Sequence, residues 1–122
     1  MPTSISSQFT IVSTDTVAAG QTLAVTNPGR TFQVIAVRAK GAGNATYTLS
    51  KADSDGSNPV QFASGAISDS ALEGWVDGNV TLASSSLTAT NQLRLVVRGA
   101  SITAVCFDCI GSPSQTLTSS IS

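Results

Sequence analysis

The sequence predicts an all-β fold, a single antiparallel β-sandwich or jelly roll of about seven to nine strands. Three observations support this prediction. Val, Ile, Thr and Phe recur in short bursts, and such residues suit a pleated, half-buried surface. Apolar residues alternate with polar ones at a period of two, and turns rich in Gly, Pro and Asn separate the segments at intervals of about 8–12 residues.

The length of 122 residues predicts one domain with a core of its own. We expect the sandwich to occupy residues 9–111. Residues 1–8 and 112–122 are rich in Ser and Thr, and we expect them to form extended N- and C-terminal arms.

Each expected strand in the first half of the domain has its own apolar alternation. The first two are marked by pairs of residues that share a face, and the third, residues 31–40, is apolar on both faces, which predicts either cover on both sides or a bulge near its middle. A half-buried strand follows it. The marker residues of the first, second and fourth strands are Phe9 and Ile11, Leu23 and Val25, and Tyr47 and Leu49.

The second half continues the pattern. Val60 with Phe62 and Val80 with Leu82 mark two strands, and residues 68–74 between them predict one short helical turn. Residues 101–109 form the last expected strand. The predicted core includes Leu93, Leu95 and Val97, which alternate with outward arginines, together with Phe32, Val34 and Leu49.

The surface chemistry points away from ionic partners. Charged residues make up 11% of the chain, whereas Ser and Thr number 19 and 15. A hydroxyl-coated surface is buried against a partner at less cost than a charged one, so we expect protein contacts, although a monomeric Ser/Thr-rich β-protein remains an alternative. The net charge of −1 without a basic run argues against nucleic-acid binding. No long apolar run and no export signal is present, so we expect no membrane contact and no export.

The residues needed for catalysis or metal binding are scarce. The chain has no histidine, which excludes a Ser-His-Asp triad and leaves Cys106 and Cys109 unable to complete a tetrahedral zinc site within one subunit. We interpret them as two small buried or half-buried thiols. Asp53, Asp55 and Asn58 resemble half of a calcium loop but fit an Asx turn better. We therefore predict no catalytic residue, no cofactor and no metal.

Four apolar side chains and one tyrosine are candidates for contacts with partners. The arms carry Ile5, Leu117 and Ile121, and each arm is too poor in apolar residues to pack alone. Ordering them requires contacts elsewhere, either on a neighbouring subunit, as we expect, or on the chain's own sandwich. Trp75 and Tyr47 are candidates for a ligand platform or an interface, with a role in the core as the alternative.

Two long stretches, TVAAGQTLAVTNPGRTFQVIAVRAKGAGNATYTLSKADSDG and SSSLTATNQLRLVVRGASITAVCF, carry a resemblance to known proteins. Within roughly residues 15–108, the chain resembles small structural proteins of tailed-phage virions. These are β-sandwich or jelly-roll proteins that often act as capsid decoration, or cement, proteins. The resemblance implies a function of surfaces and arms, and it carries over no catalytic residue.

The expected function is therefore that of a non-enzymatic virion structural protein, which stabilises the shell by bridging its subunits. The resemblance implies that the partners are the major capsid protein and further copies of the chain, as a homotrimer. It also implies synthesis in the host cytoplasm and a place on the capsid surface. The alternative is a carbohydrate- or receptor-binding module of a tail, fibre or surface protein that uses Trp75, Tyr47 and the loop 52–59.

Overall fold

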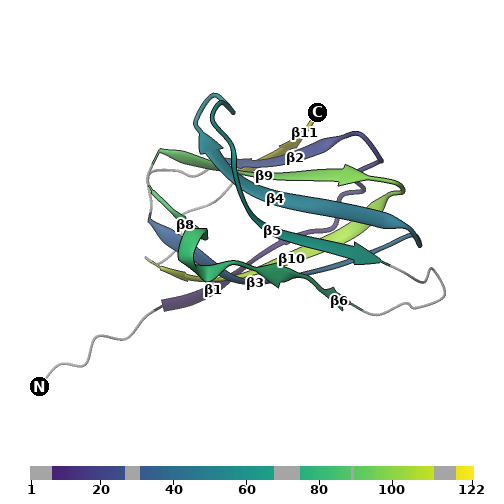
Figure 1. The fold of residues 1–122 in the computed structure, drawn as a ribbon, viewed down its shortest axis with the longest axis horizontal. Coiled ribbons are helices and arrows are strands. Elements are labelled where there is room, and N and C mark those ends of the chain that lie inside the picture. Colours follow the sequence, from purple (N-terminus) through teal and green to yellow (C-terminus); the bar gives the residue numbers. More distant parts are fainter. Residues whose placement is uncertain (1–6, 27–30, 68–74, 89, 112–117) are drawn as a thin grey trace, which may run out of the picture.

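The computed structural model describes residues 7–26, 31–67, 75–88, 90–111 and 118–122. These residues form two antiparallel sheets that face each other, as Figure 1 shows, so the predicted all-β sandwich is confirmed. Eleven strands are present in the described part of the chain, and eight of them have four or more residues. In this part of the chain, no helix is long and apolar enough to cross a membrane.

The first sheet, sheet A, has the order β1-β10-β3-β6, with β8 also paired to β3. The second, sheet B, has the order β11-β2-β9-β4-β5-β7. The strands of sheet A are β1 (Ser7–Ser13), β10 (Ile102–Gly111), β3 (Phe32–Gly41), β6 (Val76–Asp77) and β8 (Ser86–Leu87). Those of sheet B are β11 (Thr118–Ile121), β2 (Thr22–Thr26), β9 (Asn91–Arg98), β4 (Ala45–Asp53), β5 (Val60–Ile67) and β7 (Asn79–Val80).

The pairing between the two halves of the chain is nested. The strand β1 pairs with β10, β2 with β9, β3 with both β6 and β8, and β4 with β5. The contacts β10–β3 and β9–β4 join these pairs into the two sheets. Each pair is antiparallel. The early strands β1 to β4 therefore pair with later strands taken in the reverse order of the sequence.

The core lies between the sheets and contains the residues that the alternation predicted. Leu93, Leu95 and Val97 of β9 are buried with Phe32, Val34 and Leu49. Phe9 and Ile11 of β1 are partly buried and pack against this core.

The strand β3, which is apolar on both faces, contains a bulge. Val34 pairs with Cys109 and Ala36 with Asp108, which leaves Ile35 as an extra residue. The buried positions therefore shift from Phe32 and Val34 to Val37 and Ala39. Of the two predicted explanations for its two apolar faces, the bulge is the one that the structure supports.

One expected strand is different in the structure. Leu82 does not continue a strand from Val80 but opens a short 3-10 turn, Leu82–Ser84, and its side chain is 54% exposed. Gln33 holds this turn because its side-chain amide donates to the Leu82 carbonyl at 3.0 Å. The turn links β7 in sheet B to β8 in sheet A, so the chain changes sheet where the alternation predicted one strand. The expected helical turn at 68–74 lies outside the described residues.

The boundaries of the arms also differ from those expected. The strand β1 begins at Ser7, and β11 pairs with β2 of the same chain, so residues 7–8 and 118–121 belong to the sandwich. Backbone pairing explains the difference. The strand β11 forms hydrogen bonds with the edge of β2, and next to it the amide of Thr22 donates to the Ser122 carbonyl at 2.9 Å. Ile121 is half-buried against the core of its own chain. Ile5 and Leu117 lie outside the described residues.

Candidate functional site

The two aromatic candidates do not lie on one surface. Tyr47 is 3% exposed, because it alternates with the outward residues Thr46 and Thr48 and faces the core. The prediction that it serves as a surface platform is therefore wrong. Trp75 is 41% exposed, and the Nζ of Lys40 lies 4.9 Å from its ring centroid. Trp75 therefore lies at the surface, with a cation–π contact to Lys40.

The loop proposed to act with Trp75 is at the other end of the molecule. Lys40 precedes the turn into β4, whereas the loop follows Asp53 at the end of this nine-residue strand. A strand of that length spans about 30 Å. Figure 1 shows β6, which follows Trp75, far from the β4–β5 hairpin tip. A site shared by Trp75, Tyr47 and the loop is thus not formed within this chain.

The carboxylates of this loop bond to its own donors. The hydroxyl of Ser57 donates to the Asp55 carboxylate at 2.6 Å, and the Asn58 amide donates to the Asp53 carboxylate at 2.8 Å. The bond from Ser57 lowers the pKa of Asp55 below its ordinary value. This is the Asx-type turn that the sequence favoured over a calcium loop.

The hydroxyl of Tyr47 occupies an unusual position in the core. Two glycines make room for it, since a side chain at Gly65 or Gly78 would collide with the phenol oxygen. The oxygen is buried and has no hydrogen-bond partner among the described residues. Burial, followed by the charge of Asp77, raises the pKa of Tyr47 to about 12.

The two cysteines are buried free thiols, as predicted. Cys109 belongs to the core, and burial raises the pKa of its thiol to about 12. Cys106 lies on the outer face of sheet A, where the guanidinium of Arg38 donates to its sulfur at 3.7 Å and to the Asp108 carboxylate at 3.4 Å. The bond to Cys106 and the charge of Asp108 raise the pKa of Arg38. The thiols thus point to opposite faces of β10, which does not favour a disulfide between them.

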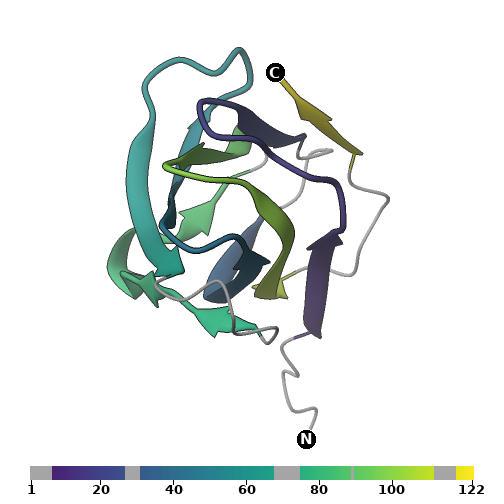
Figure 2. The same ribbon diagram turned by 90° about the vertical axis from the view of Figure 1, so that its right-hand side faces the viewer.

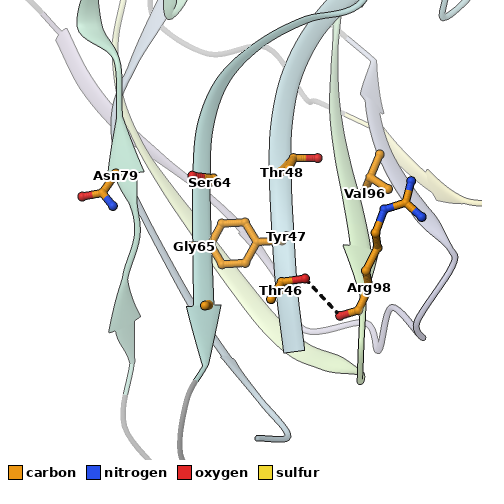
Figure 3. Close-up of a pocket in the computed structure, with 9 residues that line it drawn as sticks. Thr46, Tyr47, Thr48, Ser64, Gly65, Asn79, Val96 and Arg98 are labelled. Atoms are coloured by element: carbon orange, nitrogen blue, oxygen red, sulfur yellow. Dashed lines mark hydrogen bonds between the residues drawn. The ribbon is translucent and has the colours of Figure 1, made fainter. Parts of the chain in front are cut away.

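The outer face of sheet B carries an open groove of about 350 Å³. One row of directly paired residues crosses four strands, and a second row lies beside it. The first row is Val96, Thr48, Ser64 and Asn79, and the second is Arg98, Thr46 and Ala66. Figure 3 labels the members of both rows except Ala66, and it shows the hydroxyl of Thr46 donating to the Arg98 carbonyl at 3.5 Å. Tyr47 and Gly65, which lie between the rows, also line the groove.

The groove presents hydroxyls, an amide and a guanidinium, and no carboxylate lines it among the described residues. Its chemistry fits a neutral or anionic ligand rich in hydrogen-bonding groups. It does not fit a metal ion, and in the described ranges no group of three His, Cys, Asp or Glu side chains could hold one. The sequence analysis missed this groove. The outward Thr and Ser residues of β4 and β5 were the available signal, but their alignment depends on strand register.

No protein-family model and no curated protein matches this sequence.

Proposed function

We propose that this chain is a non-enzymatic structural protein of a virus particle, a decoration protein on the capsid surface that stabilises the shell by bridging its subunits. The observation that carries the proposal is the nested order of the strands. The proposed partners are the major capsid protein and further copies of the chain, as a homotrimer.

The nested order supports the jelly-roll form of the sandwich. A jelly roll is a double-sheet arrangement of eight strands in two Greek keys, and viral capsid domains and lectins use it. The nested pairs here correspond to one long antiparallel ribbon that is folded across the two sheets. The pairs are β1 with β10, β2 with β9, β3 with β6 and β8, and β4 with β5. Because a fold alone does not determine function, the surface must carry the rest of the argument.

The described surface suits burial against other proteins. Thr46, Thr48 and Ser64 place hydroxyls on the outer face of sheet B, and Trp75 stands exposed beside Lys40. Hydroxyls and an aromatic anchor are buried in an interface without the large cost of desolvating unpaired charges. An arrangement of this kind favours contacts between proteins over catalysis.

The test is to find the chain in particles. Particles of the virus whose genome encodes the chain should be purified on a density gradient, and the chain should sediment with them at a fixed ratio to the major capsid protein. Particles that lack it should lose their genome at a lower temperature and recover when the purified chain is added. Absence of the chain from intact particles would reject the proposal.

A carbohydrate-binding module is the second candidate, and the groove on sheet B is the observation that favours it. Its paired rows present several donors and acceptors for the hydroxyls of a sugar. Binding to immobilised glycans that is lost in Asn79→Ala and Arg98→Ala, and kept in Thr103→Ala on the other sheet, would support this candidate. Thr103 is an exposed residue outside the groove, which makes it a matched control.

A further inference from the structure

The strand β1 forms the long edge of sheet A. It pairs with β10 through seven consecutive residue pairs, and no described strand pairs with its other side. Figure 2 shows β1 at the margin of the molecule. The other edge strands in the described residues are shorter: β6, β7 and β8 have two residues each, and β11 has four. Unpaired backbone groups along a seven-residue edge are a template for another strand.

This edge lacks the features that usually prevent pairing between proteins. The sequence SQFTIVS contains no charged residue, no proline and no glycine. Its register with β10 runs without a bulge. Proteins commonly protect exposed edges with these features or with short strands, so an edge without them is suited to receive a strand.

The sequence of β1 is complementary to itself when read in the antiparallel direction. A two-fold axis at Thr10 would place Thr10 opposite its own copy and Phe9 opposite Ile11 of that copy. It would also place Gln8 opposite Val12 and Ser7 opposite Ser13. Aromatic–β-branched and Thr–Thr pairs across strands are stabilising, and no like charges would meet.

The burial of β1 fits the same arrangement. Phe9 and Ile11 point inward but are only half-buried, and Phe9 packs edge-on against Phe32 at 5.6 Å between ring centroids. On the outer face, Gln8 is exposed and Val12 is 56% exposed. The inward side chains of a second copy would extend the core beyond this edge.

We propose that β1 is a self-association surface, on which two copies pair their β1 strands antiparallel about a two-fold axis at Thr10 and join their A sheets. Such a contact is isologous, because the same patch serves both copies. It differs from the three-fold contact of the proposed homotrimer, and it does not depend on a role in a virion. Two short strands form a small interface, so we expect a dissociation constant of about 10–100 μM in solution.

Two double variants test both the contact and its register. Gln8 and Val12 are exposed, and the residues paired with them on β10 are the uncharged Ile110 and Cys106. The carboxylate of Asp108, which lies between these two, forms an ion pair with Arg38. In Gln8→Glu/Val12→Lys, each lysine would face a glutamate of the other copy. In Gln8→Lys/Val12→Lys, both pairs would be lysine against lysine. The two proteins differ only in the sign of the charge at position 8, so each is the matched control of the other.

Sedimentation over a range of concentrations gives the dissociation constant of each protein. We expect the wild type and the opposite-charge variant to dimerise, and the like-charge variant to dimerise about tenfold more weakly or worse. The melting temperatures should stay close to that of the wild type; should the like-charge variant not fold, Gln8→Glu/Val12→Glu replaces it. A wild type that remains monomeric at about 500 μM, or two variants with equal dissociation constants, would overturn the proposal. A failure of the particle test would leave this result unaffected.

Discussion

The buried hydroxyl of Tyr47 predicts the sign of the change in the free energy of unfolding that Tyr47→Phe causes. Tyr47 is the single tyrosine of the chain, it is 3% exposed, and its oxygen has no hydrogen-bond partner among the described residues. A buried tyrosine hydroxyl that makes a hydrogen bond stabilises a protein, so Tyr→Phe normally costs about 0.5–1.5 kcal/mol. Here the opposite sign is expected.

The magnitude follows from two opposing contributions. Burying a hydroxyl without a partner costs about 1–3 kcal/mol, and Tyr47→Phe removes that cost. The missing oxygen leaves a small void between Gly65 and Gly78, whose loss of contacts costs up to about 1 kcal/mol. Near pH 7 we therefore expect Tyr47→Phe to raise the free energy of unfolding by about 0.5–2 kcal/mol.

Raising the pH should increase the difference in the free energy of unfolding between Tyr47→Phe and the wild type. The pKa of Tyr47 is raised from 10.0 to about 12 in the folded protein, chiefly by burial. The neutral phenol is thus favoured by folding, so its contribution is complete below pH 10 and is lost as the pH rises through about 12. Two pKa units correspond to about 2–3 kcal/mol, of which the wild type should lose about half by pH 11, whereas Tyr47→Phe should lose none.

Two measurements check this reasoning. The ultraviolet absorbance of the phenolate reports the titration of Tyr47 directly, because the chain has no other tyrosine. Denaturant melts of both proteins near neutral pH and at about pH 11 give the difference in the free energy of unfolding, in which the shared titration of lysines and thiols cancels. A phenol that titrates near its ordinary value, together with a Tyr47→Phe variant that is less stable by 1 kcal/mol or so, would refute the assignment of an unpartnered buried hydroxyl.

Three further predictions concern the core, metals and the last strand. Leu95→Ala should lower the free energy of unfolding by about 2–5 kcal/mol in denaturant melts, because the side chain is 1% exposed, whereas Leu82→Ala at a 54% exposed position should change it by less than about 0.5 kcal/mol. Treatment with EDTA should leave the melting temperature unchanged, since the carboxylates of the β4–β5 loop bond to the loop's own donors; a decrease reversed by calcium or zinc would contradict this. Deleting residues 118–122 should destabilise the isolated domain by about 1 kcal/mol, through loss of the pairing with β2, and Ile121→Ser should do so to a lesser degree. A deletion that leaves stability intact but prevents assembly would instead favour the original expectation that this arm contacts a neighbouring subunit.

The sequence predicts those parts of the fold in which a local period determines which side of a strand is buried. Leu93, Leu95 and Val97 alternate without interruption, and all three are in the core. Leu82 fits the same alternation with Val80 but lies in a 3-10 turn, because the chain changes sheet there to bond with Gln33. Such a change depends on a tertiary contact between residues far apart in sequence, which a local pattern does not contain.

The candidate site was harder to predict for the same reason. Tyr47 was an aromatic candidate by residue type, but its position between Thr46 and Thr48 places it inside. The groove exists because β9, β4, β5 and β7 align Val96, Thr48, Ser64 and Asn79 in one row. Register between strands determines that row, and a shift of one residue would turn the same side chains toward the core.

The two sheets differ at the edges that correspond in the nested pairing. The strands β1 and β2 occupy equivalent places, since each pairs with the later strand that lies opposite it in the ribbon, β10 or β9. On the side of β2 that β9 does not occupy, β11 adds a strand from the same chain, so this edge is covered. On the corresponding side of β1, no described strand adds to sheet A. The covered edge ends in four residues rich in Ser and Thr, whereas the open edge has seven residues with Phe9 and Ile11 only half-buried. If association between copies uses main-chain pairing, this asymmetry directs it to sheet A, and the charge variants at positions 8 and 12 should affect it more than the deletion of β11 does.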